Sequence, residues 1–446
     1  MLLYVLASKC YSSYYEFMNS ASGNESSANN EQSDNHFHPA SKRKRINIST
    51  FTSFNSPNFI ALWLGTTLMI ASHQMMFVAQ GYMVYKITDS ATILGIVGGS
   101  SALPMLILAP IAGAVADKFK RKNIVLICQS ASVLLAAIVT ILIVTDLIKW
   151  QYFLITGICQ GAVWAFNAPA RQAWLPHIIS KDNLHNAISL ISAGMSSAGI
   201  IAPAIAGIIY SFKGPGAVYI IVTISASIAV LTTVFIRNTK TEASTTKTTV
   251  IHEMVAGWKY MLAERNVRLL FIIGALFTLL WSPIQSLLPV LVVDVYQKNS
   301  TSLGLLSSML GIGALIGNFI VASLPRKKRG LLLISLAFVS GSALLGISLL
   351  PFFVVGLILL LIQGFGSGSQ YPILQILVME KVDEHYRGRA MGFIMMIWGL
   401  MPLAVFPTGI AVDIWGPARV IATLGIGLLL SGSIIIITQK WLRDMD

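Results

Sequence analysis

Long runs of apolar residues alternate with short polar gaps along most of the chain. A series of six uncharged runs starts at Phe59, and a second series of six follows a longer polar segment. Their length is near the roughly 20 residues that an α-helix needs to cross a bilayer. They are too long and too uniformly apolar for barrel strands, the other structure that satisfies its own backbone in lipid. The pattern predicts twelve transmembrane helices, at residues 59–82, 93–116, 124–144, 150–167, 187–210, 217–236, 269–293, 303–324, 331–350, 352–378, 390–411 and 420–438.

The spacing of these runs predicts an all-α membrane protein with an internal duplication. Corresponding runs in the two sets of six start roughly 200 residues apart, as expected for two six-helix bundles related by a pseudo-two-fold axis. A Ser/Asn-rich beginning cannot bury enough apolar surface to fold, whether translation starts at Met1 or at Met18. We therefore expect a disordered cytoplasmic tail (1–57), a first bundle (58–236), a cytoplasmic linker with an amphipathic helix (237–268), a second bundle (269–440) and a short cytoplasmic tail (441–446).

Composition and charge add a location and an orientation. Of the 446 residues, 55% are hydrophobic and the mean hydropathy is +0.73, so apolar surface must face lipid. The net charge is +13, but Lys and Arg concentrate in alternate gaps. By the positive-inside rule, both termini of this multi-pass membrane protein lie in the cytoplasm, and nucleic acid is not needed as a partner. Few basic residues fall in the opposite gaps: Lys86, Lys149, Lys213, Lys298 and Arg419.

One short gap carries an unusual concentration of charge. The stretch "GAVADKFKRKN" holds five charged residues between the second and third runs, in the pattern GxxxDxxxRK formed by Gly113, Asp117, Arg121 and Lys122. A glycine allows a helix end to approach a neighbour, and a carboxylate can pair with a cation or a helix terminus across a cleft. The pattern predicts a cytoplasmic gate. The alternative for the basic residues is that they only anchor the loop at the membrane.

This pattern resembles the signature of the major facilitator superfamily. A second stretch, "NAPARQAWLPHIISKDNLHNAISL", resembles the Pro-Ala-Arg-Gln signature of the branch that contains the enterobactin exporter and macrolide efflux proteins. The resemblance covers about residues 58–440. It implies two bundles around a central cavity that opens alternately to the two membrane faces. We interpret three arginines near the gate as partners of Asp117 or Asp383, with loop anchoring as the alternative: Arg171, Arg387 and Arg389.

Polar side chains recur in four of the predicted helices. None of the twelve runs contains Asp, Glu, Lys or Arg, so amides and indoles are the candidates for binding. The resemblance implies that the first, fourth, seventh and tenth helices line the cavity. Each residue has interhelical hydrogen bonding or packing as its alternative. The candidate substrate-binding residues are His73, Gln80, Gln160, Trp164, Trp281, Gln285, Gln363 and Gln370.

These residues predict transport of a small amphipathic molecule that is neutral or weakly charged. His73 could carry a coupling proton, since its ordinary pKa is about 6.5, or it could be a buried neutral side chain. We expect a monomeric, proton-linked exporter without a cofactor, a metal site or enzymatic activity. The resemblance favours a siderophore as cargo, with macrolide or multidrug efflux as the alternative. A membrane sensor that does not transport is the alternative of a different class.

Overall fold

The computed structural model describes residues 52–180, 183–237, 263–324, 328–382 and 387–443, all within one compact unit. Every regular element in these ranges is helical, beginning with a short turn, η1 (Thr52–Asn55). The chain therefore has the all-helical class that the apolar runs predict. The predicted tail before residue 52 and most of the linker, including its predicted amphipathic helix, lie outside the described residues.

The first half of the chain forms the helices that cover the first six predicted runs. They are α2 (Pro57–Thr88), α3 (Ala91–Gly99), α4 (Ala102–Lys118), α5 (Arg121–Val144), α6 (Trp150–Ile178) and α7 (Leu184–Phe235). The second run is broken at Ser100, between α3 and α4. The fifth and sixth runs share α7, whose helix is interrupted by Gly214 at φ +77°. This left-handed conformation suits glycine, because it has no Cβ to clash with its carbonyl.

The second half of the chain forms the helices that cover the other six predicted runs, with a break in the seventh. The seventh run is divided at Ser282 and Pro283, because proline cannot donate the backbone hydrogen bond that would continue the helix. The helices are α9 (Arg265–Trp281), α10 (Pro283–Val290), η3 (Leu291–Val295), α11 (Ser300–Ser323), α12 (Arg329–Leu349), α13 (Phe353–Lys381), α14 (Arg387–Trp415), α15 (Pro417–Thr438) and α16 (Lys440–Arg443).

Nine segments among the described residues are long and apolar enough to cross a membrane. This number is smaller than the predicted twelve. One reason is that α7 counts once although it covers two predicted runs, and another is that only Gly399–Trp415 of α14 is counted, as a shorter apolar helix. The helix α6, which carries many polar residues, is not among the nine.

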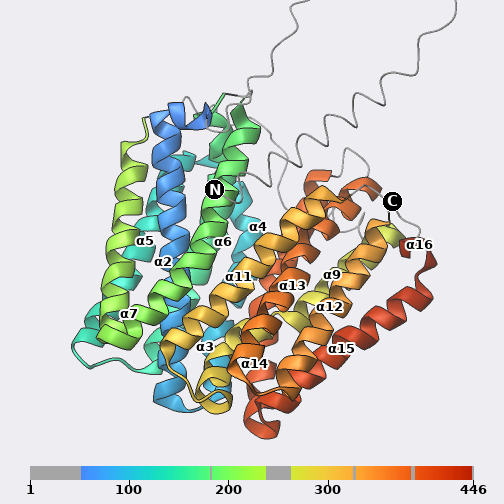
Figure 1. Cartoon of the computed structure of the whole chain (residues 1–446). Coiled ribbons are helices and arrows are strands. Elements are labelled where there is room, and N and C mark those ends of the chain that lie inside the picture. The colour runs from blue at the N-terminus through green and yellow to red at the C-terminus, as the bar shows by residue number, and fades with distance from the viewer. Residues whose placement is uncertain (1–51, 181–182, 238–262, 325–327, 383–386, 444–446) are drawn as a thin grey trace, which may run out of the picture. The chain divides into compact units, whose positions relative to one another are not determined.

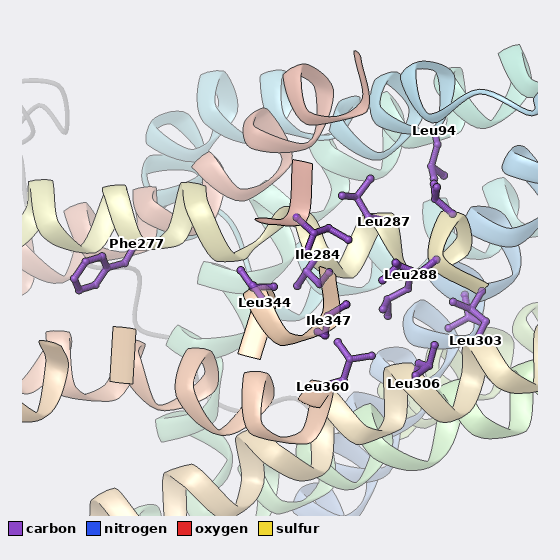
Figure 2. Close-up of a cluster of buried hydrophobic side chains, with 14 of the residues drawn as sticks. Leu94, Phe277, Ile284, Leu287, Leu288, Leu303, Leu306, Leu344, Ile347 and Leu360 are labelled. Atoms are coloured by element: carbon purple, nitrogen blue, oxygen red, sulfur yellow. The ribbon is translucent and has the colours of Figure 1, made fainter. Parts of the chain in front are cut away.

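The two halves share a hydrophobic core at one end of the molecule, which we call the Thr88 end after the last residue of α2. Tyr85 and Leu94 of the first half belong to the same buried cluster as Leu287 and Leu303 of the second. Figure 2 shows Leu94 at the edge of a cluster that also includes Leu287 of α10, Leu303 of α11, Leu344 of α12 and Leu360 of α13. α11 contacts α7 of the first half as well as α13 of its own half, and Figure 1 shows its course.

At the opposite end, which we call the Pro57 end, a separate core contains residues of the first half alone. Phe59, Val125, Trp174 and Ile236 form this cluster between α2, α5, α6 and the end of α7. In the shared core, by contrast, the first-half members all lie toward the Thr88 end, from Met75 onward on α2. The halves are therefore joined by buried apolar side chains at the Thr88 end.

Candidate functional site

Two helices in corresponding positions carry the same frame of residues. In α6 the order is Gln160, Gly161, then Asn167 and Pro169; in α13 it is Gln363, Gly364, then Gln370 and Pro372. Each pair is 203 residues apart. A Cβ on Gly161 would meet the backbone of Ser101, and one on Gly364 would meet the backbone of Leu310. The glycines thus let α6 and α13 lie against α4 and α11, which fixes the depth of the polar residues on both helices.

The two glutamines of this frame have different surroundings. The Gln160 amide donates a hydrogen bond from Nε2 to Ser132 Oγ on α5, at 3.1 Å. Gln363 is 0% exposed, and neither amide atom has a hydrogen-bond partner among the described residues. A buried amide without a partner costs free energy, so Gln363 is a position that packing alone does not explain. Gln160, in contrast, joins two helices of its own half.

The next polar position of the frame is buried in both halves. Asn167 is 1% exposed and Gln370 is 6% exposed. Neither Asn167 Oδ1 nor Gln370 Nε2 has a hydrogen-bond partner within the described part of the chain. Each half therefore offers one unpaired amide atom at the same level of its helix.

Two aromatic rings meet in the first half. The imidazole of His73 on α2 and the indole of Trp164 on α6 are in edge contact, with centroids 5.0 Å apart. His73 Nδ1 and Trp164 Nε1 are both buried and have no hydrogen-bond partner in the described ranges. Gln80 lies two turns beyond His73 and is half-buried. The structure thus brings together two of the candidate binding residues, His73 and Trp164.

The second half contains a cavity of about 90 Å³ beside α13. Its walls are mainly aromatic and aliphatic, with Trp281 and Gln370 among them. Neither Gln285 nor Gln363 is among the described residues that line it. Gln285 lies beyond the break between α9 and α10. Several lining residues were not among the predicted candidates, because residues of their types occur in any helix core: Phe277, Thr278, Ser367, Tyr371, Leu374 and Met401.

The basic residues of the charged stretch bind backbone carbonyls of their own half. Arg121 Nη1 donates to the Ala173 carbonyl oxygen at 3.0 Å and contacts the His177 ring at 3.1 Å. Lys122 Nζ donates to the Val234 oxygen at 2.9 Å and to that of Ile236. Carbonyls in the last turn of a helix carry partial negative charge, which accounts for the contacts of Lys122 at the end of α7. The contacts of Arg121 and Lys122 together tie the start of α5 to the ends of α6 and α7.

The remaining residues of the predicted gate lie at the ends of two helices. Gly113 and Asp117 fall in the last turns of α4, and Arg387 and Arg389 in the first turn of α14. The structure does not describe the side chains at these four positions, and Asp383 lies outside the described residues. Their pairing remains a prediction.

The position of Arg171 differs from the expectation. The fourth run was predicted to end at Asn167, but α6 continues through Pro169 to Ile178, so Arg171 is a helical residue two turns before the end. Its Nη2 atom is buried without a hydrogen-bond partner among the described residues, and its guanidinium lies near Cys128 of α5. Arg171 is therefore a cation inside the helix bundle and does not lie in a loop.

Two aspartates that the sequence analysis did not single out connect the halves at the Thr88 end. Asp413 of α14 accepts hydrogen bonds from Ser90 Oγ, Ala91 N and Thr92 N at 2.8 to 2.9 Å. Asp294 of η3 accepts a hydrogen bond from the hydroxyl of Tyr85. The predicted runs end two residues before Asp413 and one residue before Asp294, so the helical positions and partners of these aspartates were not apparent.

An ion pair also occurs at the Pro57 end, within the second half. Arg329 Nη1 at the start of α12 lies 2.6 Å from Glu380 Oε1 near the end of α13. It is the counterpart of the Arg121 contacts in the first half, because each fastens neighbouring helices of a single half.

The chain matches the family model described as Major Facilitator Superfamily over residues 62–404. It is 26% identical to the "Staphyloferrin A transporter" of Staphylococcus aureus (strain NCTC 8325 / PS 47) over 378 residues, which is 83% of this chain and 91% of that protein. It is 25% identical to "Macrolide efflux protein A" of Streptococcus pyogenes over 397 residues, covering 85% and 93%.

Solved structures share the fold at low sequence identity. The nucleoside transporter NupG superposes with a TM-score of 0.68 at 13% identity, covering 85% of this chain and 98% of that one. A POT family transporter in complex with 5-aminolevulinic acid gives a TM-score of 0.70 at 12% identity, covering 87% and 97%. A bacterial homologue of the human lysosomal transporter Spinster, in an inward-facing and unoccupied conformation, gives 0.65 at 13%, covering 86% and 95%.

Proposed function

The chain belongs to the major facilitator superfamily, and from this premise we propose that it is a proton-linked exporter of a small amphipathic organic molecule. The relatives named as siderophore and macrolide transporters support the class of cargo. The observation that carries the proposal is the cavity beside α13, which combines aromatic walls with Gln370 Nε2, an atom that has no hydrogen-bond partner among the described residues. Such a mixture suits a molecule with an apolar body and few polar groups.

Within this proposal the helices make twelve passes in two bundles of six. The pair α3 and α4 forms one pass, the series α9 to η3 forms another, and α7 forms two passes that meet at Gly214. The frame repeated after 203 residues supports a pseudo-two-fold relation between the bundles. We expect the protein to act as a monomer, since each bundle faces the other within one chain.

The distribution of basic residues supports a cytoplasmic Pro57 end and, with the branch of the family, a bacterial inner membrane. Arg121, Lys122, Arg237 and Arg329 all lie at this end. Because cytoplasmic loops are enriched in Lys and Arg, both termini would then be inside. With that orientation, the shared core at the Thr88 end closes the outer side of the transporter.

We further propose that the charged stretch at the end of α4 acts as the inner gate. Gly113 and Asp117 would face the first turn of α14, which carries Arg387 and Arg389, when the Pro57 end closes. Asp383 and Arg171 are the remaining candidates for pairing. Arg121 and Lys122 would hold the first half rigid during this movement, because they bind only carbonyls and a histidine of their own half among the described residues.

The cargo can be tested by comparing bacteria with and without the gene. Under iron starvation, we expect an iron-binding compound to accumulate outside cells only when the gene is intact. A macrolide such as erythromycin provides the second arm, measured as growth inhibition. A changed macrolide response with unchanged iron-binding compounds would favour drug efflux. No gene-dependent flux in either arm would favour a sensor on this fold.

Coupling can be tested in everted membrane vesicles with the compound identified in the first experiment. A pH gradient that is acidic inside should drive uptake if the exporter exchanges its cargo for protons. His73→Ala should abolish this uptake if His73 carries the proton, whereas Trp164→Phe should retain it as a control for the ring contact. Intact pH-driven uptake in His73→Ala would exclude His73 as the coupling site.

A further inference from the structure

The first turn of α3 lacks the acidic residue that would complete its cap. Ser90 is the N-cap, and its hydroxyl accepts a hydrogen bond from Ile93 N at 3.3 Å. In a capping box, the residue at the position of Ile93 would be Glu or Gln and would return a second hydrogen bond. Isoleucine cannot do so. Independently of the box, the first N–H groups of any helix have no partner within it, so those of Ala91 and Thr92 need acceptors from elsewhere in the molecule.

Asp413 provides these acceptors from the other half of the chain. Its Oδ1 accepts from Ala91 N at 2.8 Å, and its Oδ2 accepts from Thr92 N at 2.9 Å and from Ser90 Oγ at 2.8 Å. All three are hydrogen bonds to a carboxylate, which are stronger than those between neutral groups. The partial positive charge at the start of α3 also favours a carboxylate there.

Glycines allow α14 to come close enough for this contact. A Cβ on Gly409 would meet the carbonyl oxygen of Ala91, and one on Gly95 would lie 2.9 Å from the Val405 oxygen. A Cβ on Gly99 would likewise lie 2.8 Å from the carbonyl oxygen of Pro402. Asp413 lies one turn beyond Gly409 on α14. The glycine contacts therefore bring α14 to the start of α3.

A second carboxylate closes the same end in the same sense. Asp294 of the second half accepts the hydroxyl hydrogen of Tyr85 in the first half. At the Pro57 end, the ionic and carbonyl contacts of Arg121, Lys122 and Arg329 stay within one half, as far as the described residues go. Carboxylate contacts between the halves are therefore seen at the Thr88 end of this conformation.

We propose that Asp413 and the first turn of α3 form an electrostatic latch that holds the Thr88 end closed. The cap of α3 is complete only while the halves touch there, so opening that end breaks three hydrogen bonds to the carboxylate and removes these acceptors from the two N–H groups. Asp294 with Tyr85 reinforces the latch. This inference rests on the proposed alternating movement of the halves, but it concerns which residues set the balance between conformations.

The test measures distances between spin labels in full-length protein in lipid nanodiscs. In a variant without native cysteines, one pair is Lys149→Cys and Phe352→Cys, two exposed positions at the Thr88 end outside the latch. The other pair is Arg237→Cys and Leu324→Cys at the Pro57 end. Asp413→Ala should lower the ratio of closed to open molecules about tenfold or more, since hydrogen bonds to a charge contribute that much. Asp413→Asn, which keeps one acceptor oxygen, should have a smaller effect.

Asp146→Asn is the matched control, because Asp146 is exposed in a loop at the same end and asparagine tolerates its left-handed backbone. It should leave both distances unchanged. The expected result is a longer distance at the Thr88 end together with a shorter one at the Pro57 end. Unchanged distances in Asp413→Ala overturn the proposed latch. A longer distance at the Thr88 end without a shorter one at the Pro57 end also overturns it, because that result indicates local loosening of α3. Moving distances without transport of any compound would refute the proposed function and leave the latch intact.

Discussion

The helices α6 and α13 share a frame of residues but surround it with different side chains. Trp164 in α6 corresponds to Ser367 in α13, and Arg171 corresponds to Leu374, each after 203 residues. Ser367 and Leu374 both line the cavity of the second half. In the first half, the large indole of Trp164 contacts His73 instead. The repeated glycine, amide and proline positions set how the helices pack, whereas the residues between them decide what each helix presents, a ring contact with His73 from α6 and part of a cavity wall from α13.

The difference extends to how each half treats its buried amide. Gln160 is bonded to Ser132 on the neighbouring helix, so it contributes to the rigidity of the first half. Gln363 has no partner among the described residues and lies seven residues before Gln370, which faces the cavity. The two halves of this chain thus keep one packing frame and differ in the side chains around it.

The largest expected effect tests whether the frame is common to both halves. Gly161→Ala and Gly364→Ala should each destabilise the protein by about 1–3 kcal/mol, because the added Cβ meets a backbone that cannot move aside. Thermal unfolding in detergent, followed by tryptophan fluorescence, measures the change. Gly216→Ala is the control, since its Cβ would lie 3.5 Å from the Val144 side chain, an ordinary contact. A loss in only one variant would show that the two helices do not pack alike.

The second prediction compares the two tryptophans. Trp281→Ala should weaken binding of the exported compound about tenfold, because Trp281 forms part of the cavity wall and stacking on an indole is lost. Trp164→Ala should have a smaller effect on binding, since Trp164 contacts His73 and is not among the described residues that line this cavity. Equilibrium binding to purified protein provides the measurement. Equal losses in both variants would place the cargo between the halves.

The smallest expected effect concerns the buried amides. Gln160→Leu should destabilise the protein by about 1 kcal/mol, because it removes a hydrogen bond and leaves Ser132 Oγ without that partner. Gln363→Leu should be neutral or stabilising, because both amide atoms are buried without partners and leucine has no polar group to desolvate. The two unfolding midpoints, measured side by side, test this difference in sign. A clear destabilisation by Gln363→Leu would reveal a partner for its amide, such as a bound water.

The sequence by itself determined the helical membrane class, the family and the two-part repeat. Apolar runs of bilayer length report on the surrounding solvent, which acts on each helix separately, so they need no knowledge of the fold. The pattern formed by Gly113, Asp117, Arg121 and Lys122 is likewise local. The contact of His73 with Trp164 was also within reach, because both positions face inward on helices that the family places at the centre.

Only the tertiary structure decided where helices break and which distant groups meet. Arg171 falls inside α6 because the helix continues through Pro169. Gln285 lies in α10, after the break at Pro283, and is not among the described residues that line the cavity. Asp413 caps a helix that begins 322 residues earlier in the chain. The physical reason is that burial and hydrogen bonding of a polar group depend on neighbours from other helices, and hydropathy along one helix does not contain that information.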